Sequence, residues 1–355
     1  MTKKEKIIIA LGVLITLLSA ALHFAHANAV ITFGVVAVAL SLLAMVVGDA
    51  TEQLGKKMGP AVTGILQSAL GNLPELFVCI FALRAGLSQV VQAALIGSIL
   101  GNSLLVLGLA LFFGGIKNGT QYFKSEPPKM ISTLMVLAFA ALIIPTLTVN
   151  FQTAAAIHIN ALDCTVAVVL LLIFAASVFY SVKGDKNTIA VEPKTNSAVK
   201  AKGWSMPVTL IVLTIAGIGA AFVSDWFVDA LQPAMKTLGI NDVFAGLVIV
   251  AIAGNAIENV VGIQLAIKNK SDYSVSVILN SSLQVAIGLF PLLVLLSFVL
   301  GGAILSFVVS PMLIIALALS VIVTAFIVFD GESIWLEGLA LICLYVIIAS
   351  SFWWG

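Results

Sequence analysis

Long apolar stretches alternate with short polar connections along the whole chain. A bilayer hydrocarbon core about 30 Å thick needs roughly 20 apolar residues per helix. Eleven stretches meet this requirement, at residues 7–25, 29–48, 60–83, 89–113, 130–149, 161–182, 205–228, 242–267, 274–300, 303–329 and 334–354. The pattern therefore predicts an all-α membrane protein with eleven transmembrane helices. The longest connection, residues 183–203, is polar and rich in lysine, and it divides the chain near its middle.

The composition agrees with a lipid surrounding. The 355 residues are 61% hydrophobic and only 9% charged, whereas a soluble domain carries about 25% charged residues. The net charge of +1 gives no electrostatic reason to expect nucleic acid as a partner. Cys79, Cys164 and Cys343 lie in separate apolar stretches, which indicates neither a disulfide framework nor a metal cluster.

The placement of basic residues predicts the orientation of the helices, because lysine and arginine concentrate on the cytoplasmic side. With a cytoplasmic N-terminus, only Arg84 and Lys236 of the 17 basic residues fall on the opposite side. We therefore predict an integral plasma (inner) membrane protein with its N-terminus in the cytoplasm and its C-terminus outside. The lysine-rich start followed by Ala25-His26-Ala27 also fits a signal peptide. The apolar run is long for one, so we favour a retained helix.

Two short motifs indicate an internal repeat. Gly71-Asn72-Leu73-Pro74-Glu75 and Gly254-Asn255-Ala256-Ile257-Glu258 share the pattern G-N-x-x-E at an offset of 183 residues. Gly97-Ser98 and Asn280-Ser281 follow the two glutamates at equal distances. The alternative is chance, because glycine and small polar residues are common where membrane helices pack.

The offset divides the chain into a first transmembrane helix and two repeats. The predicted units are residues 1–28, a first repeat at 29–182, a cytoplasmic linker at 183–203 and a second repeat at 204–355. Each repeat would hold five helices, and an odd number forces the second copy to enter the membrane from the opposite side. Inverted repeats of this kind are typical of secondary transporters, whose sites lie near the midplane where the repeats meet.

The candidate chemistry rests on two acids. Glu75 and Glu258 are predicted near the centres of their spans, at equivalent repeat positions and without lysine or arginine at the same depth. An acidic group at the bilayer centre costs roughly 2.5–3.5 kcal/mol on insertion scales. One divalent cation or two protons could neutralise such a pair, and competition for the same oxygens at an alternately exposed site is antiport. The alternative is a buried acid pair with a purely structural role.

Neighbouring residues could complete an oxygen cage around a cation. Calcium takes six to eight oxygen ligands, including asparagine and backbone carbonyls, and the two asparagines stand three residues before the glutamates, on the same helical face. Pro74 would free the carbonyl of Leu70, and we expect a glycine-assisted helix break at Gly254. The predicted cation and proton site comprises Glu75 and Glu258, which would hold Ca²⁺, together with Asn72, Asn255, Ser98, Ser281, Gln284 and Asn102. The serines, Gln284 and Asn102 could instead be interhelical hydrogen-bonding groups.

Other acids are weaker candidates. Asp225 and Asp229 are four residues apart near the expected outer end of a helix, with Asp242 nearby. They could line an outer cation vestibule, but solvated helix ends explain them more simply.

The motifs resemble those of the calcium/proton exchangers of the cation/calcium antiporter superfamily, in a compact prokaryotic form. The resemblance rests on both G-N-x-x-E motifs, the run GSILGNSLLVLG at residues 97–108 and Ser281-Ser282-Leu283-Gln284. It implies a first helix outside two five-helix repeats, and a calcium and proton site at the two glutamates. It also implies calcium efflux driven by proton entry, with helices 2 and 7 sliding between two states. Asn259 stands where the family usually has histidine, which puts any proton relay through that position in doubt.

The resulting hypothesis is a Ca²⁺/H⁺ antiporter without a resident cofactor, with Ca²⁺ as its transported substrate and the bilayer as its solvent. The same fold could use sodium or potassium as counter-ion, or carry another divalent such as Mn²⁺, since such oxygen ligands suit several hard cations. A homo-oligomer is left open. An intramembrane enzyme is disfavoured, because the sequence has no histidine at depth and neither G-x-S-x-G nor H-E-x-x-H.

Overall fold

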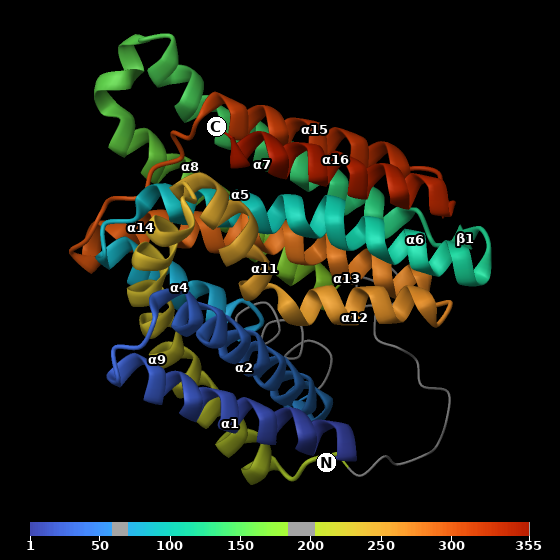
Figure 1. The fold of residues 1–355 in the computed structure, drawn as a ribbon. Coiled ribbons are helices and arrows are strands. Elements are labelled where there is room, and N and C mark those ends of the chain that lie inside the picture. The colour runs from blue at the N-terminus through green and yellow to red at the C-terminus, as the bar shows by residue number, and fades with distance from the viewer. Residues whose placement is uncertain (59–69, 184–202, 355) are drawn as a thin grey trace.

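The computed structural model describes residues 1–58, 70–183 and 203–354, and almost all of them lie in helices (Figure 1). The first half of the chain forms α1 (Lys3–Phe24), α2 (Ala29–Met58), α4 (Leu73–Arg84), α5 (Ser88–Leu100), the π-helical η1 (Gly101–Val106), α6 (Leu107–Asn118), β1 (Gln121–Tyr122), α7 (Glu126–Asn150), the 3₁₀-helical η2 (Ala154–His158) and α8 (Ile159–Lys183). The second half forms α9 (Met206–Leu238), α10 (Asp242–Phe244), the π-helical η3 (Ala245–Val250), α11 (Ala251–Gly254), α12 (Ala256–Ile267), α13 (Ser271–Gln284), the π-helical η4 (Val285–Leu289), α14 (Phe290–Leu300), α15 (Pro311–Val328), β2 (Glu332–Ser333) and α16 (Trp335–Trp353).

The helical class predicted from the sequence is confirmed, whereas the count of eleven spans is not. Within the described residues, nine helices are long and apolar enough to cross a membrane. The pair Asp242–Gly254 and Asn259–Ile267, bent by 63°, would be a tenth span. Residues 60–69 of the predicted span 60–83 and residues 184–202 of the predicted linker 183–203 lie outside the described residues. One departure from a purely helical protein is the antiparallel pairing of the two-residue strands β1 and β2.

Several helix boundaries differ from the prediction. The helix α9 continues ten residues past the predicted end at 228, because Leu231, Ala234 and Met235 remain buried in its packing. It ends at Gly239, which adopts the left-handed conformation that glycine accepts without strain. The predicted span 303–329 forms a helix only from Pro311.

The residues before α15 form a buried extended segment, defined here as residues 303–310. Gln92 Nε2 donates to the carbonyls of Ser306 and Val308, at 2.8 and 3.0 Å. Thr146 Oγ1 donates to the Phe307 carbonyl and accepts from the amide of Val309, each at 3.1 Å. Irregular backbone at membrane depth is tolerated only where protein or trapped water satisfies its polar groups. Here the side chains of Gln92 in α5 and Thr146 in α7 make those hydrogen bonds.

The two halves of the chain share irregularities at the offset of 183 residues. Asn72 interrupts the first half at φ −90° and ψ 15°, and Asn255 interrupts the second at φ −102° and ψ 23°. The π-helical η1, which begins at Gly101, and η4, which begins at Val285, likewise follow at nearly this offset. These matched breaks support a repeat that is visible in backbone geometry as well as in sequence.

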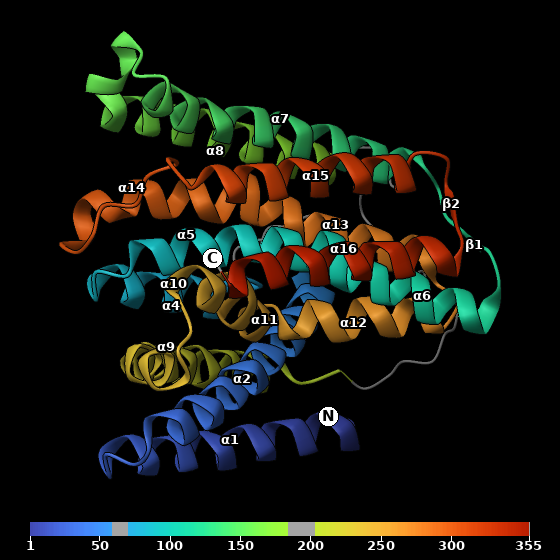
Figure 2. The ribbon, with the colours of Figure 1, turned by 45° about the horizontal axis from the view of Figure 1, so that its top comes forward.

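The helices α1, α2 and α9 form a group on one side of the bundle (Figure 2). The N-terminal end of α1 is tied by Trp204 Nε1, which donates to Glu5 Oε2 at 2.8 Å, while Lys57 Nζ donates to the Trp204 carbonyl. At the other end of α1, the ring of His23 stacks on Trp226 of α9, with centroids 5.6 Å apart. Both ends of α1 are therefore fastened to the segment that contains α9.

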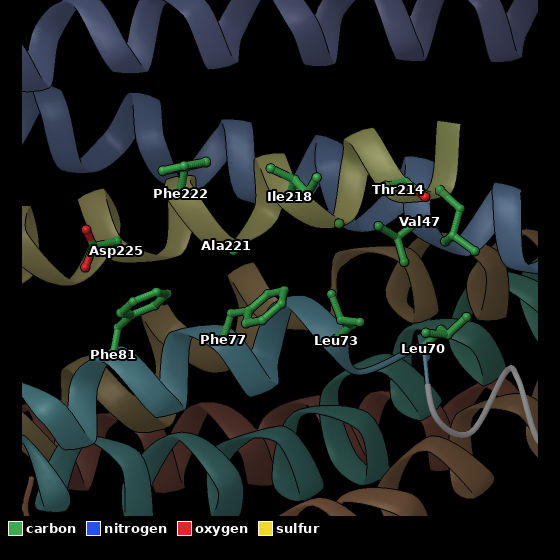
Figure 3. A pocket seen from close by; sticks show the side chains of 12 residues that line it. Val47, Leu70, Leu73, Phe77, Phe81, Thr214, Ile218, Ala221, Phe222 and Asp225 are labelled. Atoms are coloured by element: carbon green, nitrogen blue, oxygen red, sulfur yellow. The ribbon is translucent and has the colours of Figure 1, made fainter. Parts of the chain in front are cut away.

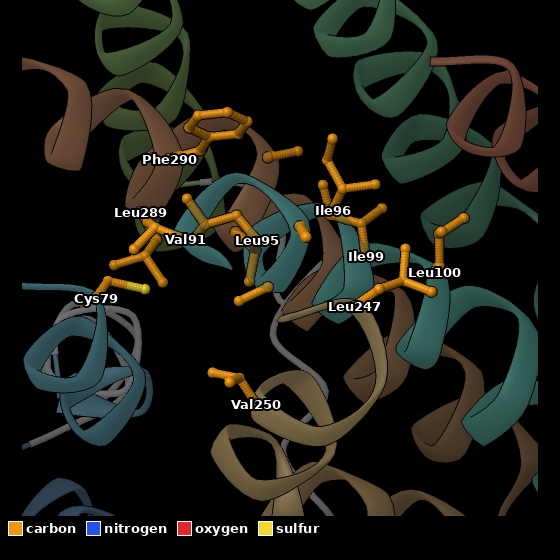
Figure 4. Packing of buried hydrophobic residues seen from close by; sticks show 14 of the residues in the cluster. Cys79, Val91, Leu95, Ile96, Ile99, Leu100, Leu247, Val250, Leu289 and Phe290 are labelled. Carbon is orange, nitrogen blue, oxygen red and sulfur yellow. The ribbon is translucent and has the colours of Figure 1, made fainter. Parts of the chain in front are cut away.

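A dense apolar core surrounds α5, which packs against η3, α4 and η4 (Figure 4). Leu95, Ile96 and Ile99 of α5 are buried, as are Leu247 and Val250 of η3. Backbones approach closely at the crossing of α5 and η3. A β-carbon added to Gly246 would overlap the carbonyl oxygen of Val90, so this contact requires glycine.

We predict that Gly246→Ala destabilises the protein by about 1–3 kcal/mol, because overpacking forces apart two backbones that cannot yield locally. Thermal unfolding of the purified protein in detergent would measure the effect. Gly34→Ala is the matched control, since nothing lies within 4 Å of the added β-carbon, and it should leave the midpoint unchanged. Equal midpoints for both variants would contradict the prediction.

Candidate cation site

The carboxylate of Glu75 lies in the first turn of α4, where the helix dipole favours negative charge. The chain breaks just before it, with Asn72 as the N-cap residue. Pro74 stands at the start of α4, where its missing N–H removes no bond within the helix. The sequence placed Pro74 inside a helix, where it would free the carbonyl of Leu70, whereas in the structure Pro74 begins α4 after a turn at Gly71 and Asn72.

The side chain of Glu75 is buried, with 1% of its surface exposed. Its Oε1 accepts a hydrogen bond from Ser98 Oγ of α5, and its Oε2 has no hydrogen-bond partner in the described part of the chain. The hydrogen-bonding groups described next to the Glu75 carboxylate are the Ser98 hydroxyl and the Asn255 amide, and neither of them is cationic. A buried carboxylate in this setting needs a cation or a proton for charge balance.

Polar side chains from both halves of the chain continue from Glu75 as one hydrogen-bonded network. Asn255 Nδ2 donates to Ser98 Oγ at 2.8 Å and to the carbonyl of Ala251 at 2.9 Å. Asn102 Nδ2 donates to Ser281 Oγ at 3.0 Å and to Asn255 Oδ1 at 3.4 Å. The network therefore joins α4, α5, η1 and α13 to the break between α11 and α12.

The second motif meets the first at this point. The α-helix α11 ends at Gly254 and α12 starts at Ala256, so the predicted break is confirmed. A β-carbon on Gly254 would lie 3.5 Å from both Cβ and Cγ of Glu75. The glycine of one motif thus borders the acid of the other. Glu258 belongs to α12, but its side chain lies outside the described residues.

Two further residues of the predicted site, Asn72 and Gln284, lie on α4 and α13 or directly before them. Asn72 is buried at the break, with its carbonyl accepting from the amide of Leu76 at 2.9 Å. Gln284 is the last residue of α13, three positions after Ser281, and is half-buried. In the described part of the chain, no cluster of three or more histidine, cysteine or acidic residues could hold a metal, so amide and hydroxyl oxygens would have to contribute.

A small cavity of about 10 Å³ lies beside the network, roughly the room that one water molecule needs. Its polar lining comes from Ser98, Asn102, Asn255 and Asn259. Asn259 was noted in the sequence only as a departure from a family motif, and no local pattern indicated that it lines the site.

A larger cavity of about 520 Å³ separates α4 from α9 (Figure 3). Leu73, Phe77 and Phe81 face it from α4, and Ile218 and Phe222 face it from α9. Because these α4 residues repeat every four positions, they form a face of their own. The helix α4 therefore presents an apolar stripe to this cavity, while Glu75 bonds to α5.

Two acids lie where the sequence did not place them. Asp225 stands inside α9 and lines one end of the large cavity, because α9 is longer than expected. Asp163 of α8, which the sequence did not single out, is buried with 1% exposed, and its Oδ1 accepts from the amide of Phe307 at 3.4 Å. It contacts the buried extended segment of residues 303–310, which no sequence pattern had indicated.

Comparison with known proteins places this geometry in a family. The profile described as "Sodium/calcium exchanger protein" matches residues 28–183 and 208–354. A "Ca(2+)/H(+) antiporter" of Aphanothece halophytica is 32% identical over 93% of this chain and 92% of its own length. The "Ca(2+)/H(+) antiporter ChaA" of Bacillus subtilis is 33% identical over 98% of this chain and 97% of its own length.

Solved structures agree with these matches. The structure of native YfkE superposes with a TM-score of 0.83 at 31% identity, covering 99% of this chain and 100% of the other. The H⁺/Ca²⁺ exchanger CAX superposes at 0.73, covering 99% of this chain and 92% of its own, and at 16% identity this likeness concerns the fold. The resemblance drawn from the motifs is confirmed: the chain is an integral membrane protein of the sodium/calcium exchanger family.

Proposed function

We propose that this protein is a secondary antiporter that exports Ca²⁺ in exchange for H⁺ by alternating access. The observation that carries the proposal is the buried Glu75 carboxylate, which has one unpartnered oxygen and no cationic neighbour among the described residues. The names of relatives that are 32–33% identical over nearly the full length favour calcium and protons as the exchanged ions.

The proposed binding set is Glu75 and Glu258 as charged ligands for Ca²⁺ or protons. Oxygens of Asn72, Asn255, Ser98, Ser281, Gln284 and Asn102 would support them. A bare divalent ion is neutralised by two carboxylates, and calcium completes its shell with neutral oxygens. Two protons neutralise the same pair, so cation and protons compete for one site. The network of Ser98, Asn255 and Asn102 supports this assignment, since it joins both halves around Glu75.

We propose that α2 and α9 slide together and that α1 moves with them. The contacts of Trp204 and Trp226 at the two ends of α1 support a three-helix unit. The cavity of about 520 Å³ lies between α4 and α9, whereas the core around α5 is dense. One rigid group of helices can shift against another where a cavity interrupts the packing between them.

The orientation and the repeat boundaries are part of the proposal. In Figure 2, α1 and α16 run in the same direction, each from the right of the view to the left, so the N-terminal end of α1 and the C-terminal end of α16 face opposite ways. This favours termini on opposite sides of the plasma membrane, with the N-terminus in the cytoplasm. The two segments matched by the family profile support repeats at residues 29–182 and 204–355.

The counter-ion distinguishes the proposed Ca²⁺/H⁺ exchange from exchange against sodium or potassium by the same fold. We predict that inverted membrane vesicles take up labelled calcium without sodium or potassium, and that a protonophore abolishes the uptake. Proton movement in proteoliposomes should follow calcium addition, and a parallel measurement with manganese would define selectivity. Strict dependence on sodium or potassium would exclude protons as the counter-ion.

We predict that Glu75→Gln reduces exchange to the level of empty vesicles, because a neutral amide cannot balance a cation or carry a proton. Glu258→Gln should have the same effect. Glu332→Gln is the control, since this exposed acid lies at β2, and it should retain full exchange. Thermal unfolding would verify that each variant is folded. Substantial transport by folded Glu75→Gln would refute the proposed site.

We predict that Ser98→Ala raises the half-saturating calcium concentration about tenfold. Losing the hydroxyl removes the hydrogen bond to Glu75 Oε1 and one of the two that Asn255 Nδ2 donates, which costs about 1–3 kcal/mol, and 1.4 kcal/mol corresponds to a factor of ten. Ser103→Ala is the matched control, because in the described part of the chain Ser103 Oγ lies 3.1 Å from Ser282 Oγ and is bonded to neither Glu75 nor Asn255. Similar calcium dependence in both variants would count against a role for Ser98.

A further inference from the structure

The amide oxygen of Asn259 is an unexplained polar atom beside the site. Asn259 lies one turn after Asn255 on α12, with its backbone N–H donating to the Asn255 carbonyl at 3.2 Å. Its Oδ1 is fully buried and has no hydrogen-bond partner in the described part of the chain. Leaving a buried acceptor unsatisfied costs about 1–3 kcal/mol, so this oxygen requires a partner that is not yet named.

The neighbouring donors do not supply that partner. Asn255 Nδ2 donates to Ser98 and to the Ala251 carbonyl. Asn102 Nδ2 donates to Ser281 and Asn255. Both amide groups are thus occupied within the network.

The small cavity of about 10 Å³ is the place where a partner for Asn259 would fit. Asn259 lines it together with Ser98, Asn102 and Asn255. The same bonded chain leads from Ser98 to Glu75, whose Oε2 is the other unpartnered acceptor next to the network. Two unsatisfied acceptors beside one hydrogen-bonded network are a suitable environment for a positive ion.

We propose that Asn259 is a ligand of the transported cation and contributes its amide oxygen Oδ1 from the cavity side of α12. This inference rests on the proposed function. Asparagine carbonyl oxygens are ordinary calcium ligands. Because the amide is neutral, it adds coordination without disturbing the balance between two carboxylates and one divalent ion. Its contribution therefore lies in cation affinity rather than in carrying protons.

The test compares Asn259→Leu, which has the same number of side-chain heavy atoms and the same branching but no oxygen, with the wild type in proteoliposomes. The half-saturating calcium concentration should rise about tenfold, while the maximal rate is largely retained. Asn259→Gln keeps a neutral amide oxygen on the same face of α12 and should restore much of the affinity. A purely structural role would not be rescued by an oxygen in this selective way.

A second readout does not depend on transport. Calcium that binds the folded protein raises its unfolding midpoint by mass action, and this shift should shrink in Asn259→Leu. Asn118→Leu is the control, because Asn118 Nδ2 donates to the Ala266 carbonyl at 3.1 Å, at the far end of α12, and its calcium-induced shift should match that of the wild type. Asn259→Ala replaces Asn259→Leu if the latter does not fold.

The outcomes separate this inference from the proposed function. Unchanged calcium affinity and an unchanged midpoint shift in folded Asn259→Leu would overturn the role of Asn259, and would leave a bound water as the partner of its oxygen. Absence of calcium-dependent proton movement in the wild type would instead overturn the antiport itself.

Discussion

The structure depends on one electrostatic constraint, the burial of the Glu75 carboxylate inside a membrane protein without a basic partner among the described residues. Its described surroundings are a serine hydroxyl, an asparagine amide, the start of a helix and a glycine that leaves room beside it. Each of these moderates the cost of a negative charge, but none neutralises it. In the proposed function, the positive charge that balances Glu75 comes from a mobile ion, either a proton or a cation.

The helix breaks make such a site compatible with a bilayer. Asn72 and Asn255 precede α4 and α12 with nearly the same backbone angles, and both are buried. Each break is followed three residues later by a glutamate in the first turn of a new helix. Irregular backbone is tolerated at membrane depth where protein surrounds it, and each helix start favours an acid. In each half of the chain, the motif therefore combines a break in the backbone with an acid in the first turn of the helix that follows.

The helix α4 links this site to the proposed motion because it has two different faces. Glu75 bonds to α5 within a dense core, while Leu73, Phe77 and Phe81 line the large cavity against α9. A shift of α9 along this face would leave the network between α4 and α5 intact. The acid can then remain in place while access to it changes, as alternating access requires.

The sequence by itself determined the membrane class, most of the apolar helices, the repeated motifs and Glu75 as a buried acid, since these follow from composition and local spacing. It also indicated Asn255, Ser98, Asn102 and Ser281, which the structure joins in one network. Only the tertiary structure decided the length of α9, the buried segment of residues 303–310 with Asp163, and the place of Asn259 beside the small cavity. Each of these depends on partners far away in the chain, such as Gln92 and Thr146 for residues 303–310. Burial and hydrogen-bond satisfaction are properties of the assembled bundle, and local pattern does not contain them.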